Sequence, residues 1–133
     1  MSEVNEATTE ATSSHNDVTL EALVRVANIG LSIGVTLSVG GALVSGILAS
    51  GKEYMESVAD LFEGVNEQGE HLASIYRRFA EGVYSEAIPD DANIEFIHLK
   101  DATIYHGTTD FNISLWRGKL SAVDGFSFGT LKK

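Results

Sequence analysis

Apolar side chains alternate strictly with small or polar ones along residues 31–39. The apolar positions are Leu31, Ile33, Val35, Leu37 and Val39, and serine, glycine or threonine occupies every position between them. A period of two is typical of a half-buried β-strand. Gly40-Gly41 follows and suits a two-residue turn, because both central positions of that turn need a positive φ. The pattern therefore predicts a β-hairpin over residues 31–49.

The turn and the hydrophobic pattern require the same strand register. Closing the hairpin at Gly40-Gly41 pairs Val39 with Ala42, Leu37 with Val44, Val35 with Gly46 and Ile33 with Leu48. Every apolar residue of the first strand then faces a small or apolar partner on one side of the sheet.

A membrane helix is the alternative for this region. Residues 26–51 contain no charged side chain and are long enough to cross a bilayer. The strict alternation and the six glycines from Gly30 to Gly51 are poorly suited to a helix. The hairpin is the better interpretation, and no membrane insertion is expected.

The hairpin is preceded by an acidic tail and a short helix. Residues 1–17 offer almost nothing to bury and are predicted to be a disordered tail, without the basic start or apolar run of a signal peptide. Asp17 can cap a helix over residues 18–29, which Gly30 would end. Its apolar stripe is Leu20, Leu23, Val24 and Ala27.

Residues 51–86 are predicted to be helical. Ser50 and Glu53 fit a capping box, in which the serine accepts from the Glu53 amide and the glutamate reaches back. Apolar residues then recur at helical spacing, at Tyr54, Met55, Val58, Leu61, Phe62 and Val65, and again at Leu72, Ile75, Tyr76, Phe79 and Val83. Gly64 and Gly69 lie between the two stripes. Either the helix breaks there and folds back on the sheet, or one long helix implies self-association.

Residues 93–131 are predicted to form four antiparallel strands. Residues 94–99 and 102–106 form one pair that turns at Lys100-Asp101, and residues 107–112 are expected to be an exposed loop. Residues 113–122 and 126–131 form the second pair, around a three-residue loop that ends in a left-handed Gly125. The fold class is α+β: a short helix, a hairpin, a helical segment or helical hairpin and further antiparallel strands, which could close into a small barrel. Residues 18–133 are taken as a single domain.

Composition narrows the possible functions. The chain has 133 residues and a net charge of −10, which disfavours nucleic-acid binding because clustered bases are lacking. It has no cysteine, and its four histidines, at 15, 71, 98 and 106, show no metal-ligand spacing. No nucleophile motif or paired acid and base stands out, so no catalytic residue, cofactor or metal site is expected.

Three stretches resemble a known family. They are residues 35–54 (VTLSVGGALVSGILASGKEY), 96–105 (FIHLKDATIY) and 116–128 (WRGKLSAVDGFSF). In this order they are similar to the gas vesicle accessory protein U family, GvpU, over about residues 18–131, with residues 56–90 matching least.

The resemblance implies a cytoplasmic, non-enzymatic accessory protein that acts in gas vesicle assembly or clustering. Its expected partners are vesicle shell or accessory proteins and further copies of itself. A candidate interaction surface comprises Tyr54, Met55, Val58, Leu61 and Phe62 from the helical stripe, and Trp116 and Arg117 from a strand position expected to be exposed. The alternative function is a small-barrel module, Sm-like or SH3-like, that binds peptide or RNA.

Overall fold

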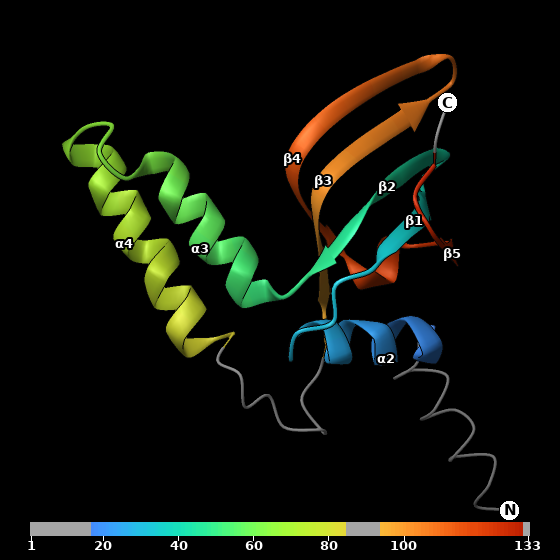
Figure 1. Ribbon diagram of the computed structural model, residues 1–133, viewed down its shortest axis with the longest axis horizontal. Coiled ribbons are helices and arrows are strands. Elements are labelled where there is room, and N and C mark those ends of the chain that lie inside the picture. Colours follow the sequence, from blue (N-terminus) through green and yellow to red (C-terminus); the bar gives the residue numbers. More distant parts are fainter. Residues whose placement is uncertain (1–16, 85–93, 132–133) are drawn as a thin grey trace, which may run out of the picture.

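The computed structural model describes residues 17–84 and 94–131 (Figure 1). The elements in chain order are α2 (Val18–Ala27), β1 (Gly34–Val39), β2 (Ala42–Ala49), α3 (Gly51–Phe62), α4 (Glu67–Gly82), β3 (Phe96–His106), β4 (Thr109–Lys119), the short 3₁₀ helix η1 (Leu120–Ala122) and β5 (Gly125–Phe128). The predicted tail lies outside the described residues except for Asp17, and so does the predicted helix end at residue 86. The α+β fold class is confirmed.

The five strands form one antiparallel sheet in the order β4-β3-β2-β1-β5. The sheet is open, so the predicted possibility of a closed barrel is wrong. Helix α2 packs on one face of the sheet (Figure 1). Its Leu20 and Val24 join Val35, Leu37 and Leu99 in the core, and each of these side chains is almost fully buried.

The predicted β1–β2 hairpin is confirmed. Val39 pairs with Ala42, Leu37 with Val44 and Val35 with Gly46, and the Leu48 amide donates to the Ile33 carbonyl at 2.8 Å. Gly40 and Gly41 have φ values of 56° and 86°, which are the positive angles that this turn requires. Local turn chemistry and apolar burial agree here, which is why the sequence was sufficient to predict the register.

The predicted cap of α2 is also confirmed. The Asp17 carboxylate accepts from the Thr19 amide at 2.9 Å, and this hydrogen bond is paired with a second one from the Thr19 hydroxyl. These bonds lower the pKa of Asp17. Gly30 ends the helix region with a φ of 122°.

The predicted turn at Lys100-Asp101 is wrong. Strand β3 continues through it, and Asp101 sits in a β-bulge with a φ of 50°. Opposite the bulge, pairing with β2 shifts by one residue between Ser45 and Ile47. Gly46 leaves room for the bulge, because a Cβ at this position would lie 3.0 Å from the Lys100 carbonyl oxygen. An aspartate that tolerates positive φ marks both turns and bulges, so the sequence pattern was ambiguous.

The true turn after β3 is at Gly107, whose φ is 63°. The region predicted to be a loop, residues 107–112, therefore contains this turn and the start of β4. Strand β4 pairs with β3 over its whole length, from His106 opposite Thr109 to Phe96 opposite Lys119.

The predicted pairing of residues 113–122 with 126–131 is wrong as well. Strand β5 crosses to the far edge of the sheet, where Phe126 lies opposite Leu37 of β1. Gly125 does not have a positive φ, and η1 takes the chain away from β4. Within residues 94–131, three strands therefore follow the helical segment, rather than the predicted four. The apolar β1 edge competes successfully for β5 because Phe126, which is half-buried there, packs against the core.

The last described residues cross the second face of the sheet. Thr36, which is buried although polar, donates to the Gly129 carbonyl at 2.8 Å, and the Leu131 amide donates to the Ser45 hydroxyl at 2.8 Å. These bonds satisfy the polar side chains of the central strands on the face opposite α2.

The helical segment is broken, and it folds back on itself rather than on the sheet. Helices α3 and α4 form an antiparallel helical hairpin that projects from the strands (Figure 1). Only its base, at Tyr54 and Tyr84, makes ring contacts with β3.

Asp101→Val tests the bulge. We expect the free energy of unfolding to fall by about 1–2 kcal/mol, because a β-branched residue is strained at positive φ. Asp101→Asn is the matched control and should be nearly neutral, since asparagine tolerates this conformation. Urea unfolding measures both; equal stability of the two variants would contradict the assigned backbone.

Candidate interaction surface

A tight turn creates the helical hairpin. Helix α3 ends at Phe62, Gly64 adopts a φ of 81°, and the Asn66 side chain caps α4 by accepting from the Gly69 amide at 2.7 Å. The Glu70 carboxylate accepts from the Gly64 amide. Glycine and asparagine thus supply both the left-handed backbone and the new helix start. The sequence indicated a break near residues 64–70, and the break is confirmed, although α4 packs on α3 and not on the sheet.

The predicted cap at the start of α3 forms in part. The Ser50 hydroxyl accepts from the Glu53 amide at 2.9 Å, as expected. The Glu53 carboxylate accepts from Lys100 of β3 at 2.8 Å. The glutamate therefore links the helical hairpin to the sheet.

Small residues bring the two helices close together. Gly69, Ala73 and Ala80 of α4 are buried, and they lie on one side of that helix. A Cβ on Gly69 would lie 2.7 Å from the Phe62 carbonyl oxygen, so only glycine fits this approach. Helix α3 contributes buried Met55 to its packed side. Larger apolar residues of α4 are covered less completely: Leu72 and Ile75 are half-buried and Phe79 is exposed.

One broad side of the helical hairpin, the charged face, carries its ionisable side chains. Helical geometry places here Lys52, Glu53, Glu56, Asp60, Glu63, Glu67, Glu70, His71, Arg77, Arg78 and Glu81. Arg77 bridges the two helices, with its Nη2 atom 3.0 Å from Asp60 and 2.9 Å from Glu63. The hydrogen bond to Asp60 is the main reason that the pKa of Arg77 lies above its usual value.

The opposite side, the uncharged face, has no ionisable acid or base within residues 51–84 apart from tyrosine. In each helix the apolar flank is rotated about a quarter-turn around the helix axis from the side that packs on the other helix. The direction of this rotation, viewed along the chain, is the same in α3 and α4. Because the helices are antiparallel, the two flanks form one continuous face. It comprises Tyr54, Ser57, Leu61, Gln68, Leu72, Ile75, Phe79 and Val83.

Large apolar side chains on the uncharged face are open to solvent. Leu61 is 60% exposed, Phe79 41% and Val83 65%. Tyr76 packs edge-on against Phe79, with ring centroids 5.8 Å apart. Exposed apolar residues gathered on one side, rather than scattered singly, mark an interaction surface.

An anchor cluster of five residues holds the base of the helical hairpin to the sheet. It comprises Tyr54, Tyr84, Phe96, His98 and Arg117. The His98 ring lies 4.8 Å from the Tyr54 ring and 5.4 Å from the Tyr84 ring, between centroids. Arg117 donates to the Tyr84 hydroxyl at 2.9 Å, and its guanidinium lies over the Phe96 ring at 3.8 Å.

The anchor cluster keeps His98 neutral. The Arg117 Nη1 atom lies 3.1 Å from His98 Nε2, and a guanidinium can only donate, so this imidazole nitrogen accepts. Burial, followed by the nearby Arg117 charge, lowers the pKa of His98 to about 3. Burial also raises the pKa of Tyr54. Gly51 starts α3 here, and a Cβ on it would lie 2.0 Å from the Tyr84 ring.

The residues of the predicted interaction surface are placed differently from one another. Leu61 and Tyr54 lie on the uncharged face, whereas Met55 and Val58 are buried and Phe62 is half-buried. Trp116 and Arg117 were expected to be exposed, but both are half-buried, Trp116 against the core and Arg117 in the anchor cluster. The sequence stripe contained Leu72, Phe79 and Val83, but its helical period could not tell the packed side from the open flank.

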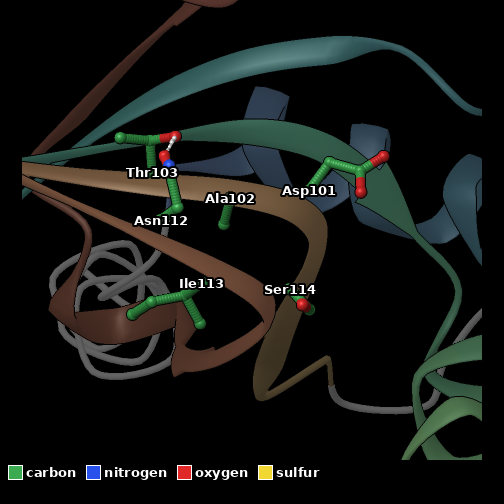
Figure 2. Close-up of a pocket in the computed structure, with 6 residues that line it drawn as sticks. All are labelled: Asp101, Ala102, Thr103, Asn112, Ile113 and Ser114. Atoms are coloured by element: carbon green, nitrogen blue, oxygen red, sulfur yellow. Dashed lines mark hydrogen bonds between the residues drawn. The ribbon is translucent and has the colours of Figure 1, made fainter.

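A hollow of about 290 Å³ lies beside the β3 bulge, and Figure 2 shows the residues that line it. They are Asp101, Ala102, Thr103, Asn112, Ile113 and Ser114. Thr103 donates to Asn112 Oδ1 at 3.0 Å, while Asp101 and Ile113 point in different directions (Figure 2). The hollow follows from the bulge and does not bring together an acid and a base.

The described part of the chain holds neither a cluster of metal ligands nor a membrane-spanning helix. Residues 17–84 and 94–131 contain no group of three or more histidine, cysteine or acidic side chains that could hold a metal. None of the helices in these same ranges has both the length and the apolar character needed to cross a membrane.

His98→Gln tests the neutral imidazole. The unfolded state takes up a proton near pH 6.5 and the folded state only near pH 3, so wild-type stability falls as the pH drops below about 6.5. The variant lacks this contribution. Between pH 7.5 and 5.5 we expect wild type to lose about 1 kcal/mol more than His98→Gln in urea unfolding. Parallel pH dependences would contradict a buried neutral His98.

Comparison with known proteins identifies the family. The family model described as gas vesicle protein GvpU-like matches residues 17–131, which include the sheet, α2 and the helical hairpin. No curated protein and no solved structure matches the chain. Because the match covers nearly all of the sequence, the chain belongs to the GvpU-like family of gas vesicle proteins.

Proposed function

We propose that this chain is a non-enzymatic, cytoplasmic accessory protein that acts in gas vesicle assembly or clustering. It acts through self-association and through contacts with vesicle shell or other accessory proteins. Family membership supports the gas vesicle setting. The uncharged face of the helical hairpin is the observation that carries the mode of action.

The uncharged face suits a binding role better than a structural one. Leu61 and Val83 add little to the packing within the chain, because they are 60% and 65% exposed, and Phe79 is also 41% exposed. Their exposure disfavours the free monomer, and covering them by a partner would remove apolar surface from water.

The anchor cluster supports the same proposal. His98, Tyr54 and Arg117 fix the base of the helical hairpin against β3 and β4, so the uncharged face is presented in a defined orientation. A pre-oriented surface loses less conformational entropy when a partner binds. In this proposal Arg117 acts as a positioning residue, and Leu61 and Tyr54 remain in the contact surface.

Phe79→Glu tests the proposed function in a vesicle-forming cell whose own copy of this gene has been deleted. We expect the variant to restore vesicle number or clustering poorly, because a carboxylate on the uncharged face must be desolvated when a partner binds. Electron microscopy counts the vesicles and scores their clustering.

Ser74→Glu is the matched control. It adds the same charge to the same helix, but at an exposed position on the charged side of the helical hairpin, and it should behave like wild type. Circular dichroism checks that both variants are folded. Full restoration of both vesicle number and clustering by Phe79→Glu would refute the proposed role of this face.

A further inference from the structure

The distribution of charge restricts what can approach the helical hairpin. Residues 51–84 contain seven acids and three bases, a net charge of −4, and all of them lie on the charged face or beside it. The whole chain has a net charge of −10. Two copies that meet through the charged face bring like charges together, whereas two copies that meet through the uncharged face bring none.

We propose that a second copy of this chain occupies the uncharged face, pairing it with its own uncharged face so that two helical hairpins form a four-helix bundle. This inference rests on the proposed function and deepens it by naming the partner of the same surface. The contact is isologous, because the same residues are used on both sides. The charged faces of both copies remain in water.

The residues of the uncharged face suit the interior of such a bundle. Leu61 from α3, Leu72 and Phe79 from α4 and the α4 C-cap residue Val83 lie on adjacent flanks of two antiparallel helices. Two such pairs can interdigitate as the inner layers of a four-helix bundle. Ser57 and Gln68 lie at the margin and near the tip, where polar side chains can stay hydrated.

The size of the uncharged face determines how strongly two copies are expected to associate. A 16-residue helix is about 24 Å long, and two helices side by side are roughly 18 Å wide, so each copy offers on the order of 430 Å². The total, near 900 Å², is below the roughly 1,200–2,000 Å² of stable interfaces. We therefore expect a reversible dimer that forms as the protein concentration rises.

Disulfide cross-linking tests the geometry, since the chain has no cysteine of its own. Leu72→Cys places a single thiol on the uncharged face, and Ser74→Cys places one two residues away on the charged side. Under mild oxidation of the full-length protein, we expect Leu72→Cys to give a covalent dimer and Ser74→Cys to remain largely monomeric. Equal cross-linking of the two variants, or none, overturns the proposal.

Sedimentation of the otherwise unmodified protein tests the equilibrium. The mass should rise from the monomer value of 14.3 kDa toward twice that value as concentration increases. Leu61→Glu should weaken this association at least about tenfold, whereas Ser74→Glu should not weaken it comparably. A wild-type protein that stays monomeric at all concentrations overturns the proposal, and so does a Leu61→Glu variant that dimerises like wild type.

The tests of the dimer and the test of the proposed function can fail independently of each other. If Phe79→Glu disturbs the vesicles while wild type stays monomeric, the face binds a different vesicle component and the second-copy inference fails alone. If the dimer forms through this face but Phe79→Glu leaves vesicle number and clustering unchanged, the interface stands and the proposed function fails.

Discussion

The position of the helical hairpin relative to the sheet depends on the contacts of one buried, uncharged imidazole, that of His98. His98 is 2% exposed and contacts the rings of Tyr54 and Tyr84 and the Arg117 guanidinium. A charged imidazole beside a guanidinium would be repelled as well as desolvated, so the contact is stable only while His98 is neutral. The sheet and the helical hairpin therefore meet at a polar contact. In it, Nε2 of His98 accepts a hydrogen bond from Arg117, and the surrounding aromatic rings keep water away from the imidazole.

The helical hairpin shows how small residues can expose large ones. Gly69, Ala73 and Ala80 let α4 approach α3 closely, and the packed side then has no room for the bulkier apolar residues of α4. Leu72 and Phe79 are displaced to the flank, where the fold does not cover them fully. The α2 side of the sheet has the opposite arrangement, because Leu37, Leu48 and Leu99 belong to the core there with α2 and are buried. The same chain thus completes one apolar surface internally and leaves another for binding.

Much of the local structure was predictable from residue patterns. The β1–β2 register, the Asp17 cap and the break between α3 and α4 each follow from interactions among residues close in the chain. Predictions failed where distant segments compete for one partner. Asp101 is typical of a turn, but pairing with β2 and β4 on both sides keeps β3 continuous through it. Strand β5 was expected beside β4, but it pairs with the open edge of β1, where Phe126 packs half-buried against the core. The candidate surface followed the same rule: the helical stripe included both Met55 and Leu61, although Met55 is buried and Leu61 is exposed.

The amino-acid sequence by itself determined the fold class, the central hairpin, the helix starts at Asp17 and Ser50 and the family resemblance, since these depend on short-range periodicity, backbone preference and motif order. Only the tertiary structure decided which edge β5 joins, that the sheet stays open, and which side of the helical hairpin remains uncovered. Those outcomes depend on which apolar surface is nearest once the chain has folded. A periodic pattern shows that a residue can be buried, but its partner is set by segments that are remote in the sequence.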